Sequence, residues 1–411
     1  MATIQIKNLG PIKDTGLINL TDVLLVIGRQ SSGKSTFMKV LCFCRWIEKK
    51  IMTSFDNTIQ AYTHNKRFTR DLKQFYRIDE MYFKEGTEII YDGDVVTISL
   101  TGVDQNAKIN RKLEAWEDRY NSKLSYIPAE RNLVSAVQNI NDTYKAKERD
   151  SIFNFIQEWY EAKDTYGSDN KLTLSLTDDF KYYSDKGLDY VVLPNGKPIT
   201  SFYASSGVQS IMPIDVMTDY IMGVVGKVVK FSMTDLMNRL MESLDTDMRN
   251  EIVHGGHEVT EEELAPIREK MKYQSAQLFI EEPEQNLYPD AQRKLVQNII
   301  RHLKAVTSVG KHRSMVVLTT HSPYVLSILN VLIADAAAVE KKPGDERLKD
   351  VVDESTLLPT DAFSAYFINK DGVFEDIKDM EIPMLSGIDL DSVSDWVDEH
   401  VGRINEILYA E

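Results

Sequence analysis

Runs of apolar residues near the amino terminus predict a strand, a loop and a helix in succession. Two short strands are expected at residues 4–9 and 16–20, and the continuous apolar run 23–27 predicts a buried strand that ends in glycine. From Ser35 to about Ile51, apolar residues recur with helical spacing. A buried strand, a glycine-bounded loop and a helix are together typical of a nucleotide-binding α/β domain.

The pattern changes twice before it returns to this form. From about residue 52 to residue 200, charged helices mix with short alternating strands, and we interpret this region as an inserted lobe. A helical region at 207–244 and a polar segment at 245–272 follow. The α/β pattern then resumes with a strand at 277–280, a helix at 289–306 and a strand at 314–319.

Composition is that of a soluble globular protein, with 43% hydrophobic and 27% charged residues in 411. No run approaches the ~18 to 20 apolar residues that span a bilayer, and residues 1–7 do not have the form of a signal peptide. We therefore expect a cytoplasmic protein with no membrane partner. Cys42 and Cys44 lie two apart on the expected helix, a spacing that suggests neither a disulfide nor a metal site.

The net charge of −15 bears on nucleic-acid binding, which depends largely on Lys and Arg side chains at phosphates. This charge argues against a dedicated DNA-coating protein. Local basic clusters at 66–73 and 111–112 leave a nucleic-acid partner possible, although solvated helix faces explain such clusters as well.

The sharpest chemical signal is a Walker A sequence between the buried strand and the helix. It consists of Gly28, Arg29, Gln30, Ser31, Ser32, Gly33, Lys34, Ser35 and Thr36. Gly28 and Gly33 let the backbone turn its amides toward phosphate oxygens at a helix N-terminus. Lys34 supplies a charge for the β- and γ-phosphates, and the Ser35 hydroxyl is placed to bind Mg²⁺. The predicted cofactors are ATP and Mg²⁺.

Two further strands end in polar residues that suit the same chemistry. The strand at 277–280 leads into Glu281 and Glu282, for which we predict Mg²⁺ support and activation of the attacking water, respectively. A solvated acidic turn is the alternative. His321 follows the strand at 314–319, where it would reach a γ-phosphate if that strand belongs to the same parallel sheet. An incidental histidine is the alternative there.

A loop of small residues at 203–210 opens the helical region. Ser206, Gly207 and Gln209 form a second candidate phosphate-binding helix start, although an ordinary capped helix start explains the same residues. Because the Walker A loop already holds its own nucleotide, we expect this segment to act on a nucleotide bound by another subunit.

With these elements in this order, the sequence resembles the ABC ATPase superfamily, and within it the SMC, RecF and OLD-like group. The resemblance covers residues 1–50 and about 200–335. It places residues 206–209 on the ABC signature, Glu281 on the Walker B aspartate, Glu282 on the catalytic glutamate, residues 284–289 on the D-loop and His321 on the switch histidine.

The resemblance implies an α/β fold: a P-loop ABC-type ATPase head with a mostly parallel sheet, an antiparallel N-terminal β part and an inserted helical lobe. The expected units are 1–52 with Walker A, 53–200 as the inserted lobe, 201–335 with the signature, Walker B and switch histidine and an insertion at about 245–272, and 336–411 as the completion of the head.

The sequence also departs from the family pattern. Glu281 replaces the usual aspartate, which puts the turnover rate in question, and Val208 replaces the second glycine of the signature. No glutamine stands out as the Q-loop residue. The stretch 127–131, Ile-Pro-Ala-Glu-Arg, looks like a motif of the OLD-like group, and nothing in the sequence assigns it a role.

OLD-like nucleases carry a C-terminal Toprim domain. Asp389 and Asp391 have the Asp-x-Asp form, but they are better explained as a helix start than as a nuclease site. The chain is therefore similar to stand-alone ATPase subunits of bacterial anti-phage systems of the Septu and PARIS kind. This resemblance implies a slow ATP hydrolase that works as a homodimer or higher oligomer and gates a separately encoded effector.

Two alternatives stay open. The first is an SMC- or RecF-like DNA-repair ATPase that binds DNA directly, which is disfavoured by the charge and by the lack of a long heptad pattern. The second is a nucleotide-dependent scaffold that does not hydrolyse ATP, which Glu281 and Val208 favour.

Overall fold

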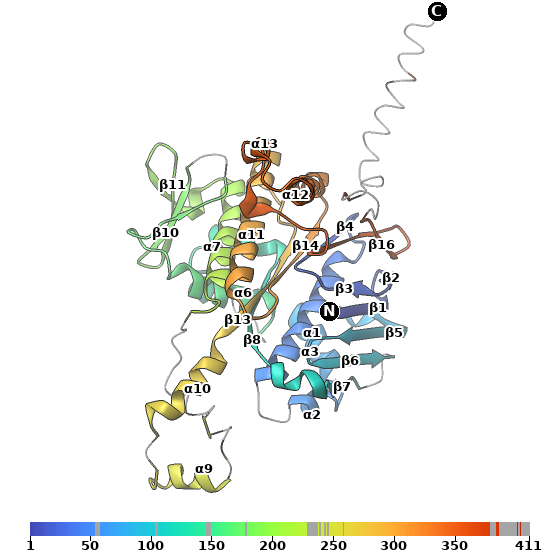
Figure 1. The fold of residues 1–411 in the computed structure, drawn as a ribbon, viewed down its shortest axis with the longest axis vertical. Coiled ribbons are helices and arrows are strands. Elements are labelled where there is room, and N and C mark those ends of the chain that lie inside the picture. The colour runs from blue at the N-terminus through green and yellow to red at the C-terminus, as the bar shows by residue number, and fades with distance from the viewer. Residues whose placement is uncertain are drawn as a thin grey trace, which may run out of the picture.

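The computed structural model is drawn as a ribbon in Figure 1. It describes the chain except for residues 54–57, 103–105, 145–148, 177–178, 228–236, 238–239, 242–243, 245, 258, 379–383, 386–400, 402 and 404–411.

The central sheet has the strand order β16-β15-β4-β14-β13-β8. These strands are β4 (Val23–Gly28), β8 (Asn121–Ile127), β13 (Tyr273–Glu281), β14 (Met315–Thr320), β15 (Phe363–Ile368) and β16 (Phe374–Asp376). All neighbouring pairs are parallel except β15 with β16. The predicted α/β fold with a mostly parallel sheet is confirmed.

A second, antiparallel sheet covers one side of the molecule, with the order β2-β1-β5-β6-β7 and β3 paired to β1 (Figure 1). Its strands are β1 (Thr3–Leu9), β2 (Ile12–Asp14), β3 (Ile18–Asn19), β5 (Phe83–Asp92), β6 (Val96–Thr101) and β7 (Lys108–Arg111). A small third sheet contains β9 (Leu172–Thr173), β10 (Lys181–Asp185), β11 (Leu188–Val192) and β12 (Pro198–Thr200).

Helices connect and cover these sheets. The α-helices are α1 (Lys34–Thr53), α2 (Thr58–Tyr62), α3 (Arg67–Tyr76), α4 (Leu133–Ala136), α5 (Ile140–Thr143), α6 (Ser151–Lys163), α7 (Ser206–Gly223), α9 (Thr246–Val253), α10 (Glu261–Met271), α11 (Pro289–Val309), α12 (Pro323–Lys341) and α13 (Glu346–Lys349). Short 3-10 turns are η1 (Glu80–Tyr82), η2 (Leu113–Asp118), η3 (Ala129–Asn132), η4 (Ser201–Tyr203) and η5 (Glu354–Thr356).

The alternation of side chains along the central strands divides the interior into two cores. In β4, Leu24 and Val26 face α1 and the antiparallel sheet, whereas Val23 and Leu25 face the other way, toward α6, α7, α11 and α12. Since both faces are covered, all six residues of β4 are buried. This accounts for the continuous apolar run in the sequence, which is typical of a parallel strand covered on both faces.

The region predicted as an inserted lobe, residues 53–200, is not one unit. β5 pairs with β1, β6 and β7 extend that sheet, and β8 forms the edge of the central sheet beside β13. Only β9–β12 form a sheet of their own. The reason is that β1 buries Ile4 and Ile6 completely, and β5 supplies the apolar strand that completes this face.

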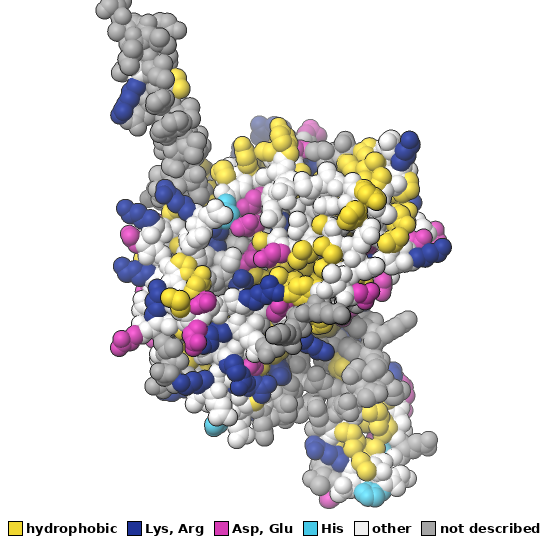
Figure 2. All heavy atoms as spheres, turned by 180° about the vertical axis from the view of Figure 1, so that it is seen from behind, with side chains coloured by type: hydrophobic (Ala, Val, Ile, Leu, Met, Phe, Trp, Pro, Cys, Tyr) yellow, Lys and Arg dark blue, Asp and Glu magenta, His cyan; other side chains and the backbone are white. Residues whose placement is uncertain are grey.

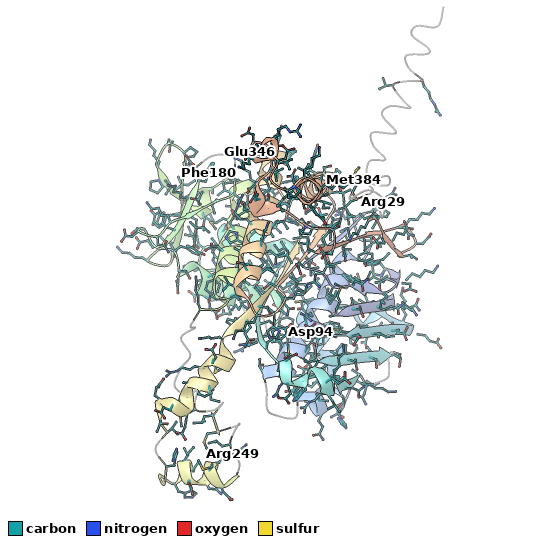
Figure 3. All side chains as sticks on the ribbon, viewed as in Figure 1. Arg29, Asp94, Phe180, Arg249, Glu346 and Met384 are labelled. Atoms are coloured by element: carbon teal, nitrogen blue, oxygen red, sulfur yellow. The ribbon has the colours of Figure 1, made fainter. Side chains whose placement is uncertain are left out.

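An arm separates α7 from β13. Helices α9 and α10 project from the body in Figure 1, and Figure 3 shows Arg249 near the far end of this arm. α10 begins with a capping box in which Thr260 and Glu263 exchange hydrogen bonds. Leu240, Leu264 and Ile267 form a small apolar cluster within the arm. The arm contains the segment predicted as an insertion at about 245–272.

Among the described helices, α12 alone has the length and composition of a membrane span, which differs from the expectation that no run approaches that length. Only 33% of its apolar window is buried. Val325, Leu329 and Leu332 lie on the buried side, in the core that α11 also lines. Core helices pass this test as well, so it does not identify a membrane segment.

A buried polar network joins the two sheets through α1. The Arg45 guanidinium donates to Gln277 Oε1 of β13 at 2.8 Å, to Glu48 Oε2 at 3.0 Å and to Asp94 Oδ2 at 2.8 Å. The other oxygen of Glu48 accepts the backbone N–H of Val95 at 2.8 Å. Figure 3 labels Asp94 beside α1. The network therefore ties the helix that follows the Walker A loop to both sheets.

We expect Arg45→Met to lower the free energy of unfolding by about 3–5 kcal/mol, because Glu48 is 0% exposed and would be left as a buried charge without a cation. Urea denaturation followed by circular dichroism measures this loss. The matched control, Arg45→Met with Glu48→Gln, should recover much of it. A loss below ~1 kcal/mol in the single variant, as for a surface ion pair, would contradict this account.

Candidate functional site

Parallel pairing brings the ends of three central strands to one edge of the sheet. Thr320 of β14 pairs with Ile27 of β4, and Glu281 of β13 pairs with Thr319 of β14. The residues that follow these strands therefore leave the sheet at the same edge. They are the Walker A loop, Glu282 and His321, which the sequence predicts as parts of one site.

The Walker A loop turns from β4 into α1 through two positive φ angles, 61° at Ser31 and 110° at Gly33. A Cβ atom on Gly33 would lie 2.8 Å from Ile12 Cγ1, so only glycine fits this turn. The hydroxyl of Ser32 is buried and has no hydrogen-bond partner. Arg29 and Gln30 are exposed, and Arg29 is labelled in Figure 3. With the first amides of α1, the loop forms a cradle of donors suited to an anion.

Lys34 places its ammonium group within this cradle and is 4% exposed. Its Nζ donates to the carbonyl oxygens of Gly28 and Arg29, each at 2.9 Å, and lies 3.1 Å from His321 Nδ1. Burial lowers the pKa of Lys34 to about 8, while the charges of Glu282, Glu284 and Glu281 act in the opposite direction. The charges of these carboxylates therefore stabilise the protonated form of Lys34, which burial disfavours.

Glu282 and His321 form a pair across two strand ends. His321 Nε2 lies 2.9 Å from Glu282 Oε1, and both side chains are about one third exposed. The hydrogen bond from His321 lowers the pKa of Glu282, burial opposes this, and the charges of His321, Lys34 and Arg131 lower it further. Glu282 is therefore an ionised, accessible carboxylate that can accept a proton or orient water.

Glu281 and Ser35 offer oxygen ligands beside the loop. Glu281 is 4% exposed, and its Oε1 has no hydrogen-bond partner. Burial raises the pKa of Tyr126, and the Glu281 carboxylate, to which its hydroxyl hydrogen-bonds, raises it further. Ser35 is in the first turn of α1. Hydroxyl and carboxylate oxygens are ligands that Mg²⁺ prefers together with phosphate oxygens, so these residues fit that ion.

Glu284 contributes to the site in a way that the sequence did not indicate. Its Oε1 accepts the backbone N–H of His321 at 2.7 Å, which fixes the position of the histidine backbone. Its other oxygen is buried without a hydrogen-bond partner.

The predicted signature segment lies at the start of α7. Ser206 is exposed, and a Cβ on Gly207 would lie 3.2 Å from the carbonyl oxygen of Asn286. The side-chain amide of Gln209 donates to the carbonyl oxygens of Ser201 and Phe202 at 3.0 and 3.1 Å, so it stabilises the preceding turn. In the described part of the chain, no hydrogen bond joins residues 203–210 to the Walker A loop.

Arg131 is the residue that sequence reasoning left without a role. It follows β8, whose Ile127 pairs with Ile280, so it reaches the same edge of the sheet. Its side chain is 0% exposed and donates to the carbonyl oxygens of Glu281 and Glu282. The strand before it, Asn-Ser-Lys-Leu-Ser-Tyr-Ile, is not an apolar run, so the only signal in the sequence was the Ile-Pro-Ala-Glu-Arg stretch itself.

The cysteines of α1 and the described part of the arm lie away from this edge. Cys42 and Cys44 are free and fully buried, and burial raises the pKa of both thiols. In the polar segment, His257 Nε2 lies 2.8 Å from Glu263. Asp389 and Asp391 lie outside the described residues.

Comparisons with known proteins agree with this assignment at a coarse level. Residues 257–326, which include Glu281, Glu282 and His321, match the family model described as an AAA ATPase domain. No curated protein matches the chain.

Three solved structures are similar over most of the chain. The SMC head domain from Thermotoga maritima shares 12% identity, covering 91% of this chain and 97% of that one, with a TM-score of 0.37. An Smc head domain with an extended coiled coil from Pyrococcus furiosus, bound to the C-terminal domain of ScpA, shares 9%, covering 92% and 96%, with a TM-score of 0.38. The ATP-binding cassette MJ1267 of an ABC transporter in its ADP conformation shares 9%, covering 97% and 99%, with a TM-score of 0.35. With TM-scores this low, these likenesses add nothing to the geometry of the site.

We expect Lys34→Ala to weaken Mg·ATP binding by about 100-fold, because a charged hydrogen-bond donor to phosphate contributes ~3 kcal/mol. Equilibrium titration with a fluorescent ATP analogue measures this change. The control Lys39→Ala, on the same helix but outside the loop, should bind as the unaltered chain does. Equal affinities for the two variants would refute the assignment of the loop.

Proposed function

We propose that this protein binds Mg·ATP at the Walker A loop and hydrolyses it, working as a homodimeric switch that gates a separate effector protein. The observation that carries the hydrolysis is the contact series Lys34–His321–Glu282, which joins the ends of β4, β14 and β13 with separations of 3.1 and 2.9 Å. A phosphate-binding cation, a histidine and an ionised carboxylate then surround one phosphate position.

Each residue of the site would have its own role in ATP binding and hydrolysis. Lys34 and the loop amides would bind the β- and γ-phosphates, and Ser35 and Glu281 would hold Mg²⁺. Bound Mg²⁺ would neutralise charge that develops on the phosphates. Glu282, whose pKa is lowered by His321, would accept a proton from water or orient it. His321 would keep the carboxylate turned toward the phosphate.

The signature segment supports a head-to-tail dimer. Ser206 is exposed and makes no hydrogen bond to the Walker A loop of its own chain in the described residues, so we propose that it contacts a nucleotide held by a second copy. Aromatic side chains are exposed close to the signature, the D-loop and the switch histidine. They are Phe202, Tyr203, Tyr288 and Tyr324, with exposed fractions of 40%, 75%, 78% and 52%. Exposed aromatic residues are common at protein interfaces.

The arm is our candidate docking site for the effector. It connects α7, which begins with the signature, to β13, which ends in Glu281. A protein bound to α9 and α10 would therefore act on two parts of the ATP site at once. The anti-phage role and the cytoplasmic location are proposed on the sequence resemblance alone.

Direct DNA binding is the second candidate, and the described surface gives it little support. In α3, Arg67 and Arg70 pair with Asp71 at 3.1 and 3.3 Å. Lys73 pairs with Glu80 at 3.1 Å, so three cations of that cluster already face carboxylates. On the one face that Figure 2 draws, Lys and Arg side chains are interspersed with acidic and polar ones. Salt-dependent binding of the chain to duplex DNA would favour this candidate.

We expect Glu282→Gln to bind ATP but to lose at least ~100-fold in kcat, because the amide keeps the shape and cannot accept a proton. Phosphate release under saturating Mg·ATP measures kcat, and gel filtration with ATP should show a persistent dimer. Asp22, an acidic residue outside the site, provides the control Asp22→Asn. Hydrolysis by Glu282→Gln at the unaltered rate would show that another residue is the general base. If the unaltered chain hydrolyses no ATP, the result favours the alternative of a scaffold that does not hydrolyse ATP.

We expect Ser206→Arg to keep ATP binding but to abolish hydrolysis and nucleotide-dependent association, because the bulky side chain blocks the proposed dimer interface. Mixing Ser206→Arg with Lys34→Ala subunits should restore part of the ATPase activity, since each mixed dimer keeps one intact composite site. Activity is compared before and after mixing. Hydrolysis by monomeric Ser206→Arg at the unaltered rate would show that residues 203–210 only cap a helix.

A further inference from the structure

Arg131 bridges the predicted signature helix and the end of the Walker B strand. Its Nε donates to the carbonyl oxygen of Ser210 in α7 at 3.1 Å. Its two terminal nitrogens donate to the carbonyl oxygens of Glu281 at 2.8 Å and Glu282 at 2.7 Å, and one also reaches Pro128 at 3.4 Å. One guanidinium thus holds three backbone segments that are far apart in sequence.

Burying the charge of Arg131 costs free energy, which argues for a specific role of this residue. The side chain is 0% exposed, and all its hydrogen bonds go to carbonyl oxygens, with no carboxylate paired to it directly. Burial lowers its pKa to about 10, and the charges of Glu284, Glu282 and Glu281 oppose that effect. An apolar side chain of similar size would fill the space without this desolvation.

The backbone of Glu282 needs support at this point. Its φ angle is 43°, in the left-handed region that costs a non-glycine residue roughly 1–2 kcal/mol. Its N–H donates to the carbonyl oxygen of Thr319 at 2.8 Å, and Arg131 holds its carbonyl oxygen from the other side. These two bonds fix the peptide units on both sides of its Cα, and so set the direction of the side chain toward His321.

A second contact ties the same strand end to α7. Asn286, which also has a positive φ of 61°, donates from Nδ2 to the hydroxyl of Ser210 at 2.9 Å. Ser210 therefore receives hydrogen bonds on both its backbone and its side chain from the segments that surround Glu282. A movement of α7 would have to change at least one of these bonds.

We propose that Arg131 is a positioning residue that aligns Glu282 and couples its backbone to the first turns of α7. A nucleotide of the partner subunit that contacts Ser206 and Gly207 would shift α7, and Arg131 would transmit the shift to the carboxylate. The proposal rests on the proposed ATP hydrolysis and gives the Ile-Pro-Ala-Glu-Arg stretch its role.

The test compares Arg131→Met and Arg131→Lys in the full chain. We expect the Kd and KM for Mg·ATP to stay within ~3-fold of the unaltered values, because the Walker A loop is unchanged. We expect kcat to fall by about 100-fold in Arg131→Met, as for a misplaced catalytic group, and by less in Arg131→Lys, which keeps the cation and can reach one or two carbonyls. Arg45→Met is the matched control, since it removes another buried arginine that makes no contact with Glu282. It should lower stability and leave the kcat of the folded protein unchanged.

Hydrogen exchange provides a readout that does not depend on hydrolysis. Adding Mg·ATP to the unaltered chain should slow exchange in residues 206–212 and 280–286 together. In Arg131→Met, residues 206–212, which the partner's nucleotide contacts directly, should still respond, and the protection of residues 280–286 should fall. If the unaltered chain hydrolyses no ATP, the proposed function fails and the exchange data still decide the coupling. Two results would overturn the proposal: unaltered kcat in Arg131→Met, or unaltered protection of residues 280–286 in that variant. If Arg131→Met does not fold, the same criteria apply to Arg131→Lys.

Discussion

The parallel register of β4, β14, β13 and β8 brings the Walker A loop, the carboxylates after β13, His321 and Arg131 to one edge of the sheet. Because these strands end at the same level, residues up to 293 positions apart in sequence come into contact without any long excursion of the chain. If a strand shifted by one residue in this register, its side chains would change to the opposite faces of the sheet. In β4, Leu24 and Leu25 would then each face the other of the two cores. The site is thus held in place by the packing of both cores.

The pKa values of the buried cations at this edge depend on burial and on the carboxylates that lie close to them. Lys34 and Arg131 are buried cations whose pKa values are lowered by desolvation, and the carboxylates of Glu281, Glu282 and Glu284 offset part of that effect. Neither cation makes an ion pair with these carboxylates: both donate mainly to backbone carbonyl oxygens. Lys34 donates to two carbonyl oxygens of its own loop, whereas Arg131 is fixed by four carbonyl partners on three segments.

Three of the nine non-glycine residues with positive φ angles in the described chain lie at the same edge. Ser31, Glu282 and Asn286 all adopt positive φ angles although none is glycine. Such conformations persist where the surrounding structure holds them, and they are common at functional sites. Here the surrounding contacts come from α7, β14 and the segment after β8. The arm joins α7 to β13, so it is covalently attached to one of the elements that hold the strained residues.

The sequence by itself determined the local features: the strand, loop and helix around Gly33, the carboxylates after β13 and the histidine after β14. Glycine spacing and apolar runs encode these features within a few residues, so no knowledge of distant contacts was needed. Only the tertiary structure decided that β5–β7 complete the antiparallel sheet instead of forming a separate lobe, because strand pairing joins segments far apart in sequence. It also decided that Gln209 binds the preceding turn and that Arg131 holds Glu282. Both depend on which carbonyl oxygens folding brings within hydrogen-bond distance, and sequence spacing does not contain that information.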